Sequence, residues 1–193
     1  MSIQLFEVPF FHYSQDVLSN LRSKIQRTGR EELVDEDAFV EKMSSSHKLV
    51  EVSVDWDSMV ALPDHREEES TYRDAFGDTR RVVTPIYTFE VNYSGSSKLL
   101  EICPSSSRVV QIEVEVSSDK FTFEIQGDDK GRLEQIKDGI KINVNNLNKE
   151  LGNFNSQLEA AVRNAVDQRK QELAKHDEGL SAFGVPIKSS RDS

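Results

Sequence analysis

The chain has 193 residues, with 34 acidic side chains against 24 Lys and Arg, which gives a formal net charge of −10. This length is enough to bury a core without disulfides or metals. The negative charge repels phosphate backbones and anionic lipid surfaces, so the composition argues against a membrane partner and against nucleic-acid binding by this chain alone.

Signals for disulfides, secretion and membrane insertion are absent from the sequence. Cys103 is the only cysteine, which excludes an intramolecular disulfide and a cysteine-based structural zinc site. The N-terminal residues lack a basic region followed by a long apolar run, and no segment approaches the roughly 20 apolar residues that a membrane-spanning helix needs. We therefore expect a soluble, cytoplasmic protein.

The N-terminal segment predicts a strand followed by a helix. The run "IQLFEVPFF" is rich in aromatic and branched residues and predicts a strand limited by Pro9. Ser14 then stands at the expected N-cap of a helix that ends at Gly29. The apolar face of this helix is expected to carry Val17, Leu18, Leu21 and Ile25.

The next segment predicts a second helix, a strand and a loop. A short helix is expected over "DEDAFVEKM", with Asp35 or Asp37 as its cap and with Phe39 and Met43 facing the core. The run "HKLVEVSVDWD" predicts a strand. Residues 63–81 are polar and charged without sustained periodicity, so we expect a long exposed loop that is a candidate contact element.

Period-two alternation between residues 86 and 126 predicts a β-sheet. The runs "IYTFEVNY", "KLLEIC", "RVVQIEVEV" and "FTFEIQG" alternate apolar with polar side chains and are joined by short polar turns. In the last run, Phe121, Phe123 and Ile125 alternate with polar residues. This pattern favours an antiparallel meander with one buried and one solvated face.

From Arg132 the apolar period changes from two to about three and a half. Apolar residues recur at alternating three- and four-residue steps, which predicts one long helix that ends near Lys175. Gly139 and Gly152 lie inside this pattern and each costs roughly 1 kcal/mol relative to alanine, which leaves open a kink at Gly152. The stretch "NVNNLNKELGNFN" is poor helix material unless its side chains bond to a neighbouring segment or the stretch is a joint.

Together these elements predict an α+β fold, an antiparallel β-meander packed with helices and followed by a long C-terminal α-helix. We expect an α+β domain over residues 1–130. Residues 131–193 are expected to form the long helix and an apolar tail, packed on the same domain.

No motif in the sequence predicts a catalytic centre. The best metal candidate is the acidic cluster of Asp55, Asp57, Asp64, His65 and Glu67, because Mg²⁺ is bound by carboxylate oxygens at such strand ends. Neighbouring carboxylates in an acidic chain are more often solvated loop residues, and the histidines lack the spacing of a zinc-binding helix. We therefore expect no catalytic residue, no metal and no cofactor.

The C-terminal stretch "GLSAFGVPIK" brings four apolar side chains together: Leu180, Phe183, Val185 and Ile187. Gly184 suits a helix C-cap, and Pro186 prevents the helix from continuing. Exposed apolar surface costs roughly 25 cal/mol per Å², so these side chains are expected to be covered. They either cap this chain or form a docking tag for a partner subunit.

The C-terminal half resembles uncharacterised sensing or adaptor modules associated with bacterial anti-phage defence loci and with nuclease or TIR effectors. Such modules combine a glycine-containing turn, a strand and a proline-serine step with an Asn-x-x-Leu helix and a Gly-x-Pro ending. The residues that carry this resemblance are Gly95, Pro104, Asn155, Leu158, Arg169, Gly184 and Pro186. The resemblance implies a sensing or adaptor part whose chemistry is performed by a fused domain or a neighbouring subunit. Because this sequence stops directly after the motif, we expect the effector to be a separate protein.

Three functional hypotheses follow from the sequence. The first is a non-catalytic protein-protein interaction subunit, a regulator, sensor or adaptor of an anti-phage complex, whose partner is a separate effector subunit. Its expected contact residues are Phe154, Leu158, Val162, Arg169, Leu180, Phe183, Val185 and Ile187. The second is a self-assembling structural protein, a homo-oligomer formed through the helical seam. The third is a small metal-dependent hydrolase that uses the acidic cluster near Asp55.

Overall fold

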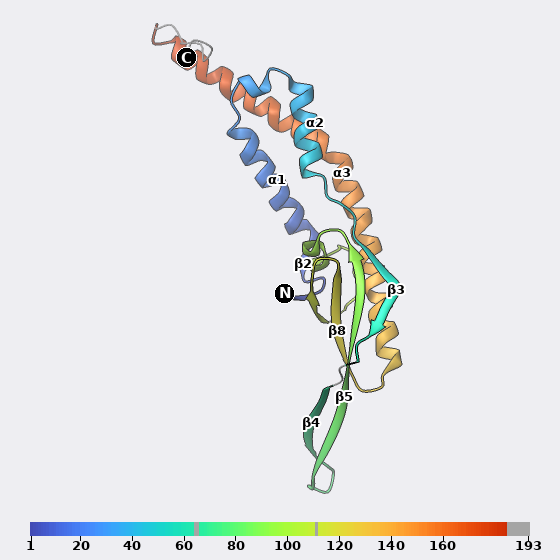
Figure 1. The fold of residues 1–193 in the computed structure, drawn as a ribbon. Coiled ribbons are helices and arrows are strands. Elements are labelled where there is room, and N and C mark those ends of the chain that lie inside the picture. Colours follow the sequence, from blue (N-terminus) through green and yellow to red (C-terminus); the bar gives the residue numbers. More distant parts are fainter. Residues whose placement is uncertain (64–65, 111, 185–193) are drawn as a thin grey trace. The chain divides into compact units, whose positions relative to one another are not determined.

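The computed structural model describes residues 1–63, 66–110 and 112–184 of the chain. The fold is α+β, with an antiparallel sheet and a long C-terminal helix, which confirms the predicted fold class (Figure 1). The chain divides into two compact units. The first contains residues 1–13 and 50–152, and the second contains residues 14–49 and the chain from residue 153 onward.

The first unit is built on a six-stranded sheet. Its strands are β1 (Ser2–Gln4), β3 (Ser53–Ala61), β4 (Arg66–Arg73), β5 (Thr79–Ser94), β7 (Glu113–Val116) and β8 (Lys120–Gln126). Five of them lie in the order β1-β7-β8-β5-β3, and β4 pairs with the N-terminal half of β5. Two short strands, β2 (Val8–Pro9) and β6 (Ile102–Cys103), form a separate parallel pair.

The sheet has one buried and one polar face, as the alternation predicts. On β8, Phe121, Phe123 and Ile125 are buried, whereas the intervening side chains face the other way. The ring of Trp56 contacts that of Phe121 edge-on, with ring centroids 6.5 Å apart. Residues 130–152 of α3 (Lys130–Ser181) lie against this face (Figure 1) and bury Ile136, Ile140, Val144, Leu147 and Leu151.

Asparagine side chains of α3 bind extended segments of the chain. The Asn148 amide accepts from the Val52 N–H at 3.0 Å and donates to the Val52 carbonyl at 2.8 Å. Asn143 makes the same two bonds with Arg108, at 2.7 and 2.9 Å. Each amide thus pairs with a backbone donor and acceptor as a neighbouring strand would. These bonds explain why the asparagine-rich stretch is helical, and of the two alternatives that the sequence left open, bonding to a neighbouring segment is the one observed.

The two central glycines of α3 have different surroundings. A Cβ atom on Gly139 would lie 2.4 Å from Val110 Cγ2, so only glycine allows this approach without displacement. A Cβ on Gly152 would meet nothing within 4 Å. The helix continues through both residues to Ser181, which confirms the single long helix.

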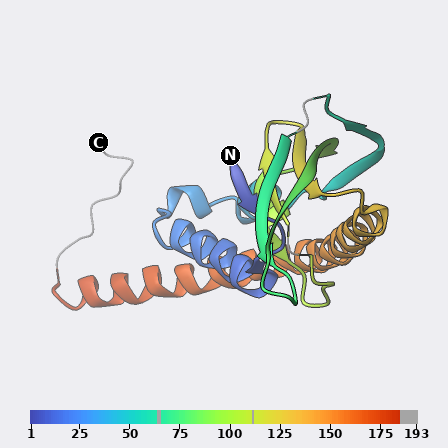
Figure 2. The ribbon, with the colours of Figure 1, turned by 90° about the horizontal axis from the view of Figure 1, so that it is seen from below.

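The second unit is helical. It contains α2 (Glu36–His47), most of α1 (Phe10–Gln26), the 3₁₀ turn η1 (Glu31–Leu33) and the later part of α3 (Figure 2). Its core cluster consists of Leu21, Ile25, Leu33, Val40, Leu158, Val162, Ala165 and Val166. The predicted cap of α2 is confirmed, since the Asp35 carboxylate accepts from the Ala38 N–H at 3.1 Å. Phe39 and Met43 pack against the cluster as expected.

Several predicted boundaries near the N-terminus are wrong. The first run forms two strands rather than one, because the chain turns at Phe6, which has a positive φ of 55°. Helix α1 starts at Phe10, so Ser14 is a buried residue inside the helix and not its N-cap. The strand predicted over residues 47–57 begins only at Ser53.

Two other segments differ from the predicted secondary structure. The run "KLLEIC" is mainly a 3₁₀ turn, η2 (Ser97–Glu101), because Leu99 and Leu100 are both buried and cannot alternate between two faces. Among the described residues of the next run, 108–110 and 112–116, the strand covers residues 113–116. The expected loop over residues 63–81 is also wrong, since most of it forms β4 and the start of β5.

Candidate interaction site

The predicted contact residues on α3 are mostly used inside the second unit. Leu158 and Val162 belong to the buried cluster, and Phe154 packs against it. The Arg169 guanidinium donates to the Thr28 carbonyl at 3.2 Å. The helical seam is thus occupied by residues of this chain.

The predicted contact residues of the tail are only partly described. Leu180 is half-buried in the last turn of α3, and Phe183 is 79% exposed. The N–H groups of Phe183 and Gly184 donate to helix carbonyls, and Gly184 has a positive φ of 69°, which suits the expected C-cap. Val185 and Ile187 lie outside the described residues.

The acidic cluster near Asp55 shows turn-type contacts. The Asp55 carboxylate accepts from the Asp57 N–H at 3.1 Å, and Ser58 Oγ donates to the Asp55 carbonyl at 2.6 Å. Two members of the cluster, residues 64 and 65, lie outside the described residues. Within the described ranges, no three His, Cys, Asp or Glu side chains are grouped so that they could hold a metal ion.

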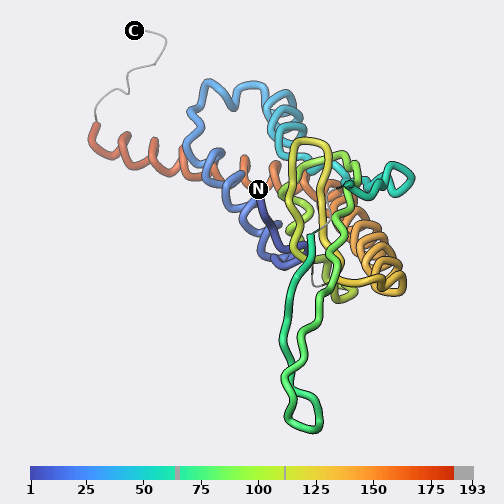
Figure 3. Tube along the Cα trace, turned by 60° about the horizontal axis from the view of Figure 1, so that its bottom comes forward, coloured from blue at the N-terminus to red at the C-terminus, as the bar shows by residue number. Residues whose placement is uncertain are grey.

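The hairpin of β4 and residues 79–85 of β5, which we call the arm, is the most exposed folded element of the first unit. β5 pairs with β8 from Ile86 and with β3 from Phe89, so residues 79–85 extend past both strands (Figure 3). All of β4 and residues 79–83 of β5 are exposed on both faces. Among the exposed residues are the apolar side chains Tyr72, Phe76, Val82 and Val83.

The tip of the arm is an ordered turn. Asp74 Oδ1 accepts from the N–H groups of Phe76 and Asp78, each at 3.0 Å, and Asp74 Oδ2 accepts from Arg80 Nε at 2.9 Å. Gly77 occupies a positive φ of 87° that the turn requires. This network fixes the backbone around Phe76, whose side chain is 90% exposed.

The bonds at Asp74 also change its acidity. Partial desolvation opposes ionisation, but the backbone N–H groups and the Arg80 guanidinium donate to the carboxylate and stabilise its charged form. The net result is a pKa of Asp74 below the ordinary carboxyl value. The turn is therefore held by a carboxylate that stays ionised at neutral pH.

Charged side chains of the arm are only partly paired. The ion pairs are Arg66 with Glu124, Arg80 with Asp74, and Arg81 with Glu69, and Glu68 accepts from Gln126. Glu67 and Arg73 have no ion-pair partner within the described part of the chain. Within the described residues, two opposite charges near the two ends of β4 are therefore not used in ion pairs.

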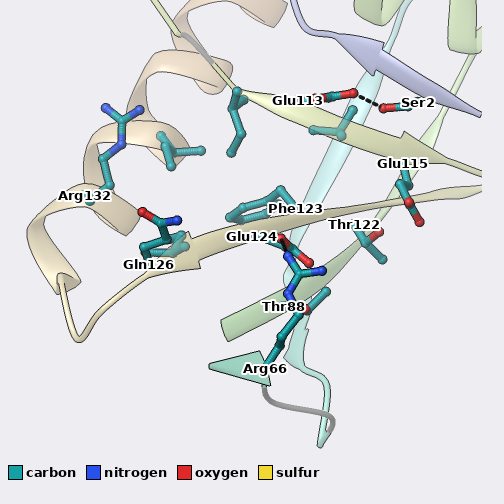
Figure 4. Close-up of a pocket in the computed structure, with 14 residues that line it drawn as sticks. Ser2, Arg66, Thr88, Glu113, Glu115, Thr122, Phe123, Glu124, Gln126 and Arg132 are labelled. Atoms are coloured by element: carbon teal, nitrogen blue, oxygen red, sulfur yellow. Dashed lines mark hydrogen bonds and ion pairs between the residues drawn. The ribbon is translucent and has the colours of Figure 1, made fainter. Parts of the chain in front are cut away.

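A hollow of about 670 Å³ lies beside β7 and β8 and is lined by polar side chains and also by Phe123, Ile125 and Ile136. In Figure 4, Arg66 reaches toward Glu124, to which it donates at 2.8 Å, and Ser2 bonds to Glu113. Two of the carboxylates that line the hollow are thus already bonded to side chains of this chain. The lining of the hollow is more polar than apolar, whereas small-molecule sites are predominantly apolar.

Comparison with protein-family models, curated proteins and solved structures found no match for this chain. None of the described helices combines the length and the apolar character that crossing a membrane requires. The sequence predicted the exposure of the described residues between 63 and 81 but not their hairpin structure, and their role as a contact element stays a prediction. The turn sequence "DAFGD", with Asp three residues before Gly, is the signal that identifies the tip.

Proposed function

We propose that this chain is a non-catalytic protein-protein interaction subunit and that the arm is its contact element. The observation that carries the proposal is that residues 66–83 are ordered in a paired hairpin while both faces are solvent-exposed. An isolated two-stranded hairpin is only marginally stable in water. Covering the exposed apolar side chains in a complex would add the stabilisation that the arm does not obtain from its own chain.

The tip supports a protein partner in particular. Phe76 is a large aromatic side chain held on a turn that the Asp74 network keeps in one conformation. Aromatic residues are enriched among interface hot spots, and a preorganised loop loses less conformational entropy on binding. The mixed charge of the arm, with carboxylates beside arginines, favours a protein surface over a phosphate backbone.

The biological setting is a further part of the proposal. A role as regulator, sensor or adaptor of a bacterial anti-phage complex is proposed from the resemblance of the C-terminal half. A cytoplasmic location is proposed from the single cysteine, Cys103, which is free. Loss of phage resistance on deletion of the gene, with rescue by the intact chain but not by arm variants, would support this setting.

The proposed function is tested in two steps. A partner is first isolated from the source cells by its binding to the tagged chain, and its affinity for the purified chain is then measured. We expect Phe76→Ser to weaken binding of the purified partner at least about tenfold, in the range of an interface hot spot. Val109→Ser is the matched control, because Val109 is 85% exposed but lies outside the arm. A partner that binds both variants as tightly as the unmodified chain would refute the arm as contact element.

A further inference from the structure

The backbone groups on the outer edge of the arm can be assigned from the sheet. Ile86 pairs with β4 and β8 at once, so these two strands lie on opposite sides of β5. The Pro85 carbonyl accepts from Gly127, which follows β8, and the Thr88 carbonyl accepts from Leu62, which follows β3. Backbone groups alternate between the two sides of an antiparallel strand, so even-numbered residues of β5 point at β4.

This alternation determines which residues of β4 direct their backbone N–H and C=O groups at the outer edge. Ser70 lies opposite Val82, so both direct their backbone groups at each other. The odd-numbered residues of β4 therefore present their N–H and C=O groups to the outer edge: Glu67, Glu69, Thr71 and Arg73. No other strand pairs with this edge in the part of the chain that the structure describes.

We infer that a second copy of this chain pairs with the outer edge of β4, antiparallel and symmetric about Ser70. In this register Glu67 of one copy lies opposite Arg73 of the other, and the two-fold axis forms the pair twice. Three charged residues of β4 lack an ion-pair partner within the described chain, and of these only Glu68 is hydrogen-bonded to another side chain, that of Gln126, which leaves Glu67 and Arg73. Oppositely charged cross-strand neighbours stabilise a sheet.

The remaining contacts in this register are also compatible. Glu69 lies opposite Thr71 of the second copy, and Glu68 lies opposite Tyr72, so no like charges face each other directly. The outward backbone groups of Glu67, Glu69, Thr71 and Arg73 all find partners, and two hairpins become one four-stranded sheet. A sheet of that size is more stable than an isolated hairpin.

The other edge of the arm fits a second copy less well. Symmetric pairing about Val82 would end at Pro85, which has no N–H and whose carbonyl already accepts from Gly127. Symmetric pairing about Arg81 would place two like charges opposite each other. The charge complementarity thus selects the β4 edge.

This inference rests on the proposed function, that the arm binds protein, and it names one partner as a second copy. The contact is small, so we expect a reversible dimer with micromolar or weaker affinity. Sedimentation velocity of the full chain from low micromolar to submillimolar concentration should show a monomer-dimer equilibrium.

A charge swap tests the register. Glu67→Arg and Arg73→Glu should each raise the dimer dissociation constant at least about tenfold, because each places like charges together twice. The double variant Glu67→Arg with Arg73→Glu restores opposite charges and should recover the affinity to within about threefold of the unmodified chain. Glu41→Arg, on the exposed face of α2, is the control and should dimerise normally.

Proline substitutions test the edge. Thr71→Pro removes an N–H that faces the outer edge of β4 without removing a β4–β5 ladder bond, and it should abolish dimerisation. Val83→Pro removes an outward N–H on the opposite edge and should leave the dimer intact. Thermal unfolding of each variant checks that the chain remains folded.

Two results would overturn the inference: a monomer at every concentration, or a double charge swap that fails to restore a dimer lost in the single variants. If the chain is monomeric, but the Phe76→Ser variant fails to bind a partner from the source cells that the unmodified chain binds, the inference fails and the proposed function stands. If arm variants affect neither dimerisation nor partner binding, both fail.

Discussion

The two halves of β5 are held in place by different forces. Residues 86–92 pair with β8, and Val91 within them is fully buried. Residues 79–83 pair with β4 and leave Val82 and Val83 exposed. The first half is stabilised by burial of apolar surface, whereas the second depends on a backbone ladder and on surface ion pairs, which each contribute little. The side chains of the arm are therefore available for binding, while those of the sheet body are committed to folding.

The two regions should differ most in the free energy of unfolding that is lost when an apolar side chain is shortened to alanine. Phe121 is fully buried and its ring lies near those of Trp56, Tyr93 and Phe123, so Phe121→Ala should lower the free energy of unfolding by about 3–5 kcal/mol. Val83→Ala in the arm should change it by less than about 0.5 kcal/mol. Urea denaturation of both variants measures these values. Comparable losses would contradict the division between body and arm.

A smaller loss is expected from the asparagine bonds of the body. Asn148→Ala leaves both backbone groups of Val52 without their partners and should cost about 1–3 kcal/mol. Asn145→Ala is the matched control, because Asn145 is exposed on the same helix and alanine is the better helix former there. Denaturation curves in which the two variants behave alike would show that the bonds do not stabilise the fold.

Alanine substitutions at the two central glycines of α3 should change the stability of the chain in opposite directions. Gly139→Ala forces a Cβ into Val110 and should destabilise the chain by about 1–3 kcal/mol, as overpacking does. Gly152→Ala meets open space and should stabilise the chain by roughly 1 kcal/mol through helix propensity. Thermal melting distinguishes them, and a stabilising Gly139→Ala would mean that the close approach of Val110 is not required.

The smallest effect is expected when the pH is lowered, and this change in local structure should be confined to the tip of the arm. The folded-state pKa of Asp74 lies below its ordinary value of 3.8, so its contribution is fully present above that value and is lost as the pH falls through the folded pKa. Amide NMR signals of Phe76 and Asp78 should then shift together, with a midpoint below 3.8. Asp74→Ala should remove this transition, and a midpoint above 3.8 would contradict the network.

The sequence was sufficient for elements that have a clear apolar period. The seam of α3 and the alternation of β8 follow from residue spacing, because burial on one face imposes that spacing. The sequence offered Asp35 or Asp37 as the cap of α2, and the structure selects Asp35. The arm was predicted to be a loop because both of its faces are solvated, so no apolar alternation marks its strands. Its pairing depends on backbone N–H and C=O groups, which residues carry whatever their side chain, proline excepted.

The candidate site could be predicted only in part from the sequence, because the pairing of the arm depends on its backbone. An exposed contact element over residues 63–81 was expected, but the roles of Glu67 and Arg73 follow only from the register of β4 and β5. Conversely, Leu158 and Val162 have the spacing of a binding seam, and periodicity does not tell whether such a seam is covered by α1 and α2 or by a partner.

The most direct test of the central claim is removal of the arm. Replacing residues 69–83 with Asn-Gly joins the facing pair of Glu68 and Thr84 by a two-residue hairpin turn and leaves the body of the sheet intact. We predict a melting temperature within roughly 2 °C of the full chain, together with loss of dimerisation and of partner binding. A protein that unfolds much earlier, or one that keeps both binding activities, would contradict the assignment of the arm to binding rather than to folding.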